Sequence, residues 1–198
     1  MFKYFILYIL IVGLSITSCK SKNKKIESKA IVSDNTTGFP VIDLLREDVD
    51  NVMKTPYYLY KKSTNVKTNK LVDSVALDRN EFKKMIEPIT TIDVTSKTAK
   101  ENFKEISFHD LSTKSYSIIT TPLNESNEIK SITTLLNDET NKLKNIFIVI
   151  EKRDKDSTIR SQYFWKANKS LQIIVATQYK KQTVKEIKYF INWNDIAE

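Results

Sequence analysis

The chain has 198 residues, with 32 lysine and arginine residues against 24 aspartate and glutamate residues, which gives a formal net charge of +8. It contains one cysteine, one histidine and two glycines. One cysteine cannot form an intramolecular disulfide, and one cysteine with one histidine cannot supply a Cys/His zinc cage. Two glycines are too few for a glycine-rich phosphate loop or a dinucleotide-binding fingerprint, so we expect neither a metal nor a cofactor.

Residues 1–18, MFKYFILYILIVGLSITS, have the composition of a targeting segment. Lys3 supplies a positive charge, and an apolar run of eleven residues follows from Tyr4 to Leu14. This run is too short to cross about 30 Å of hydrocarbon as a permanent helix. The pattern therefore predicts a signal peptide over 1–18, with a retained N-terminal anchor helix or a buried helix as the alternatives.

Ile16, Thr17, Ser18 and Cys19 close this segment. An apolar residue three positions before a cysteine, with small residues between them, resembles the lipobox of bacterial lipoproteins, although Thr17 is a less usual member of that motif. The resemblance covers the first 19 residues and implies cleavage before Cys19 and lipidation of its thiol. Several acyl chains anchor a protein stably, because each buried CH₂ contributes about 0.8 kcal/mol. The alternative for Cys19 is a small apolar residue at a cleavage site.

Residues 19–38 are expected to form a lysine-rich tether, since 20–29 hold five lysines and one glutamate without apolar periodicity. In lipoproteins an acidic residue directly after the cysteine alters the destination, whereas Lys20, Ser21 and Lys22 stand there in this chain. The resemblance therefore implies the outer membrane, facing the periplasm, with the cell surface as the alternative. The resemblance also implies that the membrane is a partner of this chain, bound through the N-terminal lipid.

The charge of the remaining chain is nearly balanced. Residues 30–198 hold 26 basic and 23 acidic residues, a net charge of +3. Nucleic-acid binding needs a concentrated basic face interleaved with aromatic residues, so we expect no nucleic-acid partner. Attraction of the tether to anionic headgroups is a simpler use of its lysines.

We expect a helix over 39–54, because apolar residues recur there at helical spacing and Pro40 suits the first turn. The apolar residues are Ile42, Leu45, Val49, Val52 and Met53. The acidic residues of the same helix suggest either a solvated face or, less simply, a cation site. They are Asp43, Glu47, Asp48 and Asp50.

Two segments, TPYYLYKKS and LVDSVAL, flank the polar residues 64–69 and predict a β-hairpin. Asp78 followed by Glu81 resembles a capping box that opens a second helix. Pro88 is expected to mark the end of that helix.

Ser96 is expected to cap a further short helix through about Glu105. From Lys114 onward the period becomes two, which predicts strands. These strands are 114–121, 128–136, 143–150, 158–166, 170–179 and 185–193. Residues 146–150 are apolar on both faces and predict a central strand that is covered on both sides. Short polar connections favour an antiparallel meander.

The predicted fold is therefore α+β, in a single domain over 39–198. It consists of a C-terminal antiparallel meander of about six strands, with the N-terminal helices packed on one face.

Little in the sequence indicates catalysis. His109 and Asp110 are adjacent in the chain, and adjacent residues in a strand point to opposite faces, so Asp110 is badly placed to orient the ring. No nucleophile elbow is present. Paired carboxylates such as Asp138/Glu139 and Asp154/Asp156 fall in predicted turns, where acids are ordinary turn formers. We therefore expect a structural or surface role for His109 and no enzymatic activity.

Aromatic residues cluster on the predicted C-terminal strands. They form either a ligand or partner surface or the core beneath the helices, and the core is the more ordinary role of large aromatic residues. The residues of this possible surface are Tyr163, Trp165, Tyr179, Tyr189 and Trp193.

The segments LLNDETNKLKNIFI, WKANKSLQI and INWND lie in a region, roughly 55–195, that resembles small uncharacterised lipoproteins of Bacteroidota. This resemblance implies a cell-envelope address and no particular activity. We expect a non-catalytic envelope lipoprotein that binds a protein partner or an envelope component. The alternative is a carrier of a small apolar ligand or lipid, with a pocket between sheet and helices.

Overall fold

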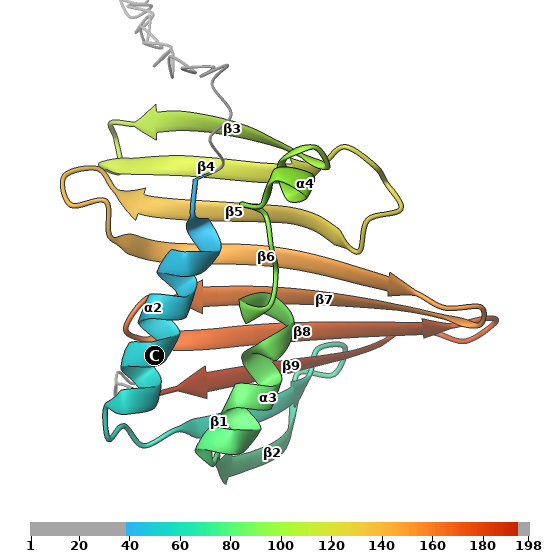
Figure 1. Ribbon diagram of the computed structural model, residues 1–198. Coiled ribbons are helices and arrows are strands. Elements are labelled where there is room, and N and C mark those ends of the chain that lie inside the picture. Colours follow the sequence, from blue (N-terminus) through green and yellow to red (C-terminus); the bar gives the residue numbers. More distant parts are fainter. Residues whose placement is uncertain (1–38, 194–198) are drawn as a thin grey trace, which may run out of the picture.

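The computed structural model describes residues 39–193, which form one antiparallel sheet of nine strands and three short helices. The strand order is β2-β1-β9-β8-β7-β6-β5-β4-β3, and all three helices lie on the same side of the sheet (Figure 1). The helices are α2 (Val41–Lys54), α3 (Arg79–Thr90) and α4 (Lys97–Lys100). The strands are β1 (Tyr60–Asn65), β2 (Lys70–Ala76), β3 (Phe103–Asp110), β4 (Ser115–Pro122), β5 (Ile129–Asn137), β6 (Leu143–Arg153), β7 (Ser157–Lys166), β8 (Ser170–Tyr179) and β9 (Lys185–Asn192). The predicted signal peptide, the tether and Cys19 fall outside the described residues.

The predicted α+β fold with about six strands is wrong, because the described residues are mainly β and only 19% helical. Each of the six predicted strands has a counterpart, but three further strands belong to the same sheet. The predicted hairpin of β1 and β2 forms, and β1 also pairs with β9. At the opposite edge, β3 pairs with β4 where a helix through about Glu105 is expected. The helix that Ser96 caps lasts only four residues, and the chain beyond it alternates with a period of two, as in Ile106-Ser107-Phe108.

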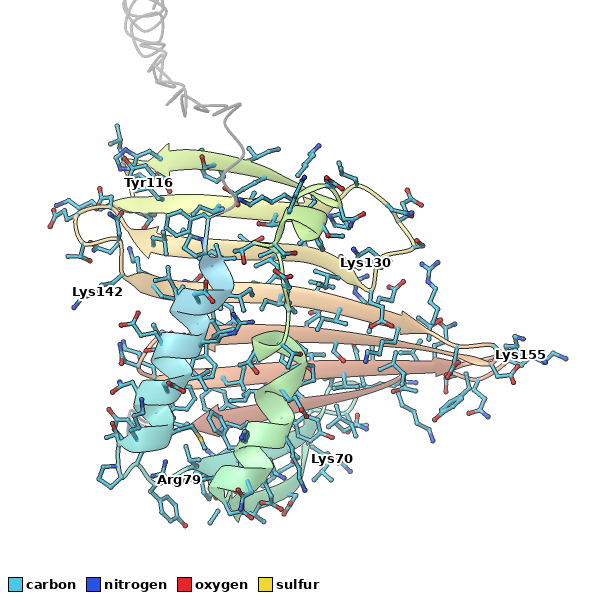
Figure 2. The ribbon with its side chains drawn as sticks, viewed as in Figure 1. Lys70, Arg79, Tyr116, Lys130, Lys142 and Lys155 are labelled. Atoms are coloured by element: carbon cyan, nitrogen blue, oxygen red, sulfur yellow. The ribbon has the colours of Figure 1, made fainter. Side chains whose placement is uncertain are left out.

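Two arginines connect the long helices at both ends. Arg79, the first residue of α3, lies beside the end of α2 (Figure 2) and donates to the main-chain oxygens of Val52, Met53 and Thr55 at 3.1, 2.7 and 2.7 Å. Arg46 of α2 donates to carbonyl oxygens at and beyond the end of α3, at 2.7 and 3.1 Å. Each guanidinium satisfies carbonyl groups that a helix leaves unpaired at its C-terminus. The two helices therefore lie side by side and antiparallel, and an arginine near the start of each one binds the C-terminal end of the other.

The start of α3 is confirmed and its predicted end is wrong. The Asp78 carboxylate accepts hydrogen bonds from the main-chain N–H groups of Asn80 and Glu81, at 2.7 and 2.9 Å, as an N-cap does. Pro88 lies inside the helix, which continues to Thr90. Because Pro88 is exposed and close to the last turn, the helix loses one donor there without having to bury the freed carbonyl.

The core lies between the sheet and the helices. On β6, Ile146, Ile148 and Ile150 belong to this core, whereas Phe147 and Val149 point to the opposite side. The expectation that this strand is covered on both sides is wrong, since none of the three described helices lies over the second face (Figure 1). Val149 is nevertheless buried, as its neighbours on the adjacent strands shield it. We refer to this second side of the sheet as the far face.

The turns use asparagine and lysine where glycine is usual. Five described non-glycine residues have positive φ, between 48° and 63°, and each lies in or beside a turn between strands. Asparagine tolerates this left-handed region better than other residues with a side chain, and three of the five are asparagine. The five are Asn69, Lys114, Asn141, Asn168 and Lys181.

Candidate functional site

The five aromatic residues singled out in the sequence all belong to the helix side of the sheet. Trp165, Trp193 and Tyr163 are buried, with exposed fractions of 0%, 2% and 6%. The ring centroids of Trp165 and Trp193 lie 4.9 Å apart. The ring centroid of Phe82 on α3 lies 6.2 Å from that of Trp165 and 5.9 Å from that of Trp193. Tyr189 is partly buried against this core, and Tyr179, the last residue of β8, is exposed. The three buried rings present no surface to a partner.

Trp165 is also fixed by a polar contact. Its indole N–H donates to the carboxylate of Asp48 on α2 at 2.6 Å, and the same carboxylate oxygen accepts from the main-chain N–H of Asn168 at 3.2 Å. Of the acidic residues of α2, Asp48 therefore connects the helix to the turn between β7 and β8. In residues 39–193 no group of three potential ligands lies close enough to hold a metal ion.

A groove of about 420 Å³ lies beside this contact, between α2 and the turn that joins β5 to β6. Most of the residues that line it are polar, including Glu47, Asp48 and Asn51 of α2 and Asn168 of the turn between β7 and β8. Pockets for apolar ligands are lined mainly by hydrophobic and aromatic side chains. The composition of this groove therefore gives no support to a lipid-carrying pocket.

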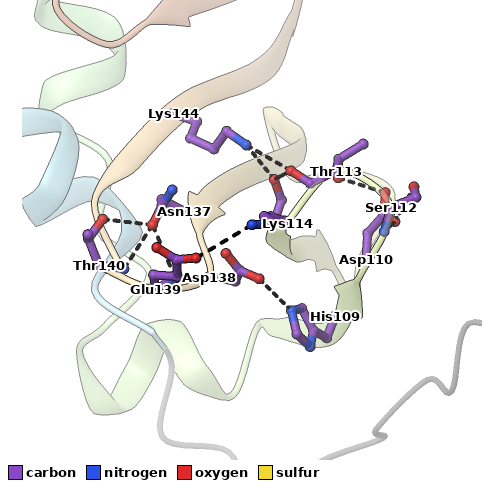
Figure 3. A network of polar contacts seen from close by, with 11 residues as sticks. His109, Asp110, Ser112, Thr113, Lys114, Asn137, Asp138, Glu139, Thr140 and Lys144 are labelled. Carbon is purple, nitrogen blue, oxygen red and sulfur yellow. Dashed lines mark hydrogen bonds and ion pairs between the residues drawn. The ribbon is translucent and has the colours of Figure 1, made fainter.

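His109 takes part in a network that joins two turns (Figure 3). Its Nε2 lies 3.1 Å from a carboxylate oxygen of Asp138. Its ring stacks on that of Tyr116, with a centroid distance of 4.3 Å and an angle of 17° between the ring planes. Both side chains of the His109–Asp138 pair are largely buried, with exposed fractions of 26% and 15%. Among the described residues, no hydroxyl group is hydrogen-bonded to the ring. The network therefore attaches β3 to the turn after β5, and it contains no aligned nucleophile.

Asp110, next in the chain, does not orient His109. Its carboxylate accepts hydrogen bonds from the main-chain N–H and the hydroxyl of Ser112, at 2.9 and 2.6 Å, and from the hydroxyl of Thr113 at 2.8 Å. The hydroxyl and N–H of Ser112, together with Thr113, lower the pKa of Asp110 from 3.8 to about 2. Across the two turns, Lys144 donates to the Thr113 carbonyl at 3.1 Å and to the Ser115 hydroxyl at 2.7 Å.

The far face carries the feature that the sequence analysis missed. The strand registers align one residue from each of eight neighbouring strands in a straight line across the sheet. In sheet order these residues are Lys62, Phe190, Gln172, Phe164, Phe147, Thr133, Ile119 and Ile106. We call this line the cross-sheet row. Five of its eight residues are apolar, and all are at least partly exposed, including Phe164 at 37% and Ile106 at 40%.

Positive charge surrounds the cross-sheet row. By the alternation along each strand, the far face carries more cationic than acidic side chains. The cations include Lys62, Lys104, Arg160, Lys166 and Lys188, and the acids include Asp110, Glu151 and Glu186. Burial raises the pKa of Glu151, but the hydrogen bond and charge of Arg153, with a bond from Arg160, hold it below its usual value. Glu151 is thus neutralised by Arg153 and Arg160. The remaining lysines outnumber the remaining acids, so the net charge of the far face is positive.

We expect Asp48→Ala to lower the free energy of unfolding by about 1–3 kcal/mol, because it leaves a buried indole N–H without a partner. Asp48→Asn keeps an acceptor oxygen and should cost less. Urea unfolding followed by tryptophan fluorescence measures the difference. The matched control is Asp50→Ala, which removes an exposed ion pair with Lys54 that contributes about 0–1 kcal/mol. Equal losses for the two alanine variants would contradict the role of Asp48.

The Asp110 carboxyl should titrate at about 2 in carbon-detected NMR, and Ser112→Ala should raise its pKa toward 3.8. Because the pKa of the folded state lies below that of the unfolded chain, the turn gains stability above about pH 4. This stability is lost as the pH falls through the pKa of Asp110 in the folded state, about 2. Asp93, whose pKa is also about 2 through hydrogen bonds from Ser96 and Thr95, is the internal control and should not change. An unchanged pKa of Asp110 in Ser112→Ala would show that the Ser112 hydroxyl does not lower it.

Comparison with known proteins identifies no relative. The chain matches no protein-family model, no curated protein and no solved structure. No helix within residues 39–193 is long and apolar enough to span a membrane. A functional conclusion must therefore be drawn from the geometry of the chain's own residues.

Proposed function

We propose that this chain is a non-catalytic lipoprotein of the cell envelope, anchored through Cys19, whose domain binds an acidic protein partner on the far face. The expected location is the outer membrane, facing the periplasm. The anchor rests on the sequence of residues 1–19, and the binding activity rests on the exposed cross-sheet row.

The cross-sheet row is the observation that carries the binding proposal. All three described helices lie on one side of the sheet, whereas the far face exposes the five apolar residues of the cross-sheet row, three of them phenylalanines. Completing the burial of such side chains contributes up to about 1.5–3 kcal/mol each, and aromatic anchors near the centre of a patch often dominate binding. Partly exposed apolar residues that gather on one face, here interrupted by Gln172 and Thr133, are a common mark of an interaction site.

The charge around the row supports an acidic partner. Lys104, Lys166 and Lys188 flank the apolar residues and would steer a negatively charged surface toward them. Cations at the rim of an interface mainly raise the association rate, and the apolar centre supplies most of the affinity. Acidic proteins with exposed apolar residues fit this arrangement better than a polysaccharide, which offers few apolar groups.

A carrier of apolar ligands receives less support. The space between the sheet and the long helices is filled by Phe82, Trp165, Trp193 and aliphatic side chains. The groove beside α2 is polar and open. Neither region offers the apolar enclosure that such a ligand requires.

Replacing Cys19 with serine should release the protein from membranes into the soluble fraction, since the acyl chains would no longer be attached. Fractionation of cells that express the wild-type chain and Cys19→Ser measures this. A substitution of Ser21 with alanine, two residues beyond the cysteine, is the control and should leave the protein in the membrane fraction. Tight membrane association of Cys19→Ser would overturn the anchor.

A photo-crosslinking residue at position 164 should capture a defined acidic protein in living cells, because Phe164 lies in the cross-sheet row. The same crosslinker at Leu123, which is 62% exposed in a turn, is the control and should capture little. Lys188→Glu should reduce the yield at position 164, as it reverses a flanking charge. Identical products from both positions, or no protein product at position 164, would contradict the binding face.

A further inference from the structure

β3 is the strand at one edge of the sheet, and among the described residues only one strand, β4, pairs with it. Its pairing with β4 runs without a register shift over all eight residues. The opposite edge is different, since a β-bulge interrupts the pairing of β1 with β2 beside Ser63 and Thr64. Bulges turn an edge away from further pairing, whereas a straight edge is a template for another strand.

The hydrogen-bond alternation defines which groups of β3 face outward. The main-chain N–H of Leu123 donates to the carbonyl of Asn102 at 2.8 Å, in the same register as the β3–β4 ladder. Bonded and non-bonded pairs alternate in an antiparallel ladder, so even-numbered residues of β3 bond to β4. The N–H and C=O groups of Glu105, Ser107 and His109 therefore point away from the sheet.

We propose that β3 pairs with the β3 strand of a second copy of this chain, antiparallel and with the two-fold axis at Ser107. In this register Lys104 faces the partner's Asp110, and Glu105 faces the partner's His109. Ile106 faces the partner's Phe108. The first pair has opposite charges and the third is apolar, whereas Glu105 and His109 of the second pair already contact the main-chain N–H of Phe39 and the carboxylate of Asp138 within their own chain. Cross-strand pairs of the first and third kinds stabilise a sheet, and two-fold symmetry forms each of them twice.

Neighbouring registers lack this complementarity. If the axis moves to Ile106, Lys104 faces Phe108. If it moves to Phe108, Ile106 faces Asp110. Both shifts place a charge opposite an apolar side chain and lose the pairing of Lys104 with Asp110. The strand sequence is therefore self-complementary in one register.

The pairing would also extend the far face. Ile106, at the end of the cross-sheet row, is 40% exposed, and the partner's Phe108 would lie directly opposite it. The apolar surfaces of the two copies would then be continuous across the axis. Pairing through one strand buries a small area, at the low end of the range for specific complexes, so we expect a weak, concentration-dependent dimer.

Cysteine crosslinking of the full-length chain in membranes tests this arrangement. In the proposed register the two copies of residue 107 form a hydrogen-bonded pair with Cα atoms about 5.5 Å apart, which a disulfide can bridge. Ser107→Cys should give a disulfide-linked dimer under mild oxidation. The wild type, whose one cysteine is Cys19, and Ser74→Cys on the bulged β2 edge should not.

Charge reversal supplies the second measurement. Lys104→Glu in the Ser107→Cys chain should weaken association at least about tenfold, because it places like charges opposite each other twice in the dimer. Lys70→Glu makes the same change on β2, at the opposite edge of the sheet (Figure 2), and should have no effect. Sedimentation of the detergent-solubilised full-length chain measures the association constants.

The proposal is overturned if Ser107→Cys and Ser74→Cys crosslink equally, if Lys104→Glu leaves association unchanged, or if the chain stays monomeric at all concentrations. Crosslinking of position 107 only to a different protein would also overturn it, because the edge would then serve another partner. These outcomes are independent of the crosslinks from Phe164.

Discussion

The hydrogen bond from the Trp165 indole to Asp48 determines where the long helices lie. A buried indole N–H needs an acceptor, and in this chain the acceptor is a helix carboxylate. The contact sets α2 over β7, and the arginines at both ends then align α3 beside it. Phe82 of α3 in turn contacts Trp165 and Trp193. Trp165 therefore contacts both long helices, directly through Asp48 of α2 and Phe82 of α3.

This placement explains why one face of the sheet is partly covered and no described helix lies over the other. Nine strands at about 4.8 Å spacing make a sheet roughly 40 Å wide, whereas α2 and α3, which run across the strands (Figure 1), are only about 20 Å long. The described helices are too few to cover even one face completely, and all lie on the same side. Within residues 39–193 no helix lies over the far face. Its apolar residues are accordingly interleaved with Thr133, Gln172 and lysines.

Much of the local structure could be predicted from the sequence, and the fold class could not. Period-two alternation identified the C-terminal strands, and Asp78 identified the start of α3. The strand β3 was missed because Ser96 is a good helix cap, and the period-two alternation of Ile106, Ser107 and Phe108 beyond the four-residue helix was not recognised as a strand. The fold class failed because a hairpin carries no information about which distant strand it joins. The pairing of β1 with β9 depends on contacts between opposite ends of the domain.

The candidate site was missed for a related reason. The sequence analysis singled out aromatic residues by their density, and three of these residues are the core itself. The cross-sheet row takes a single residue from each strand, so no segment of the chain is enriched in it. Only the register between strands brings Phe147, Phe164 and Phe190 into line. The opposite orientations of His109 and Asp110 were accessible, because alternation along a strand is a local property.

The position of β9 has a consequence for the order in which the strands can pair during folding. Strands β3 to β8 each pair with the strand that follows in the chain, so these pairings are local in sequence and close small loops. β1 and β2 are made first, yet their only strand partner outside the hairpin within residues 39–193 is β9, which ends at Asn192. The N-terminal hairpin therefore has one side of β1 unpaired until β9, at the other end of the domain, has reached it. Until then Leu59 and Leu77, which flank the hairpin and lie in the core of the folded domain, remain open to contacts with other chains.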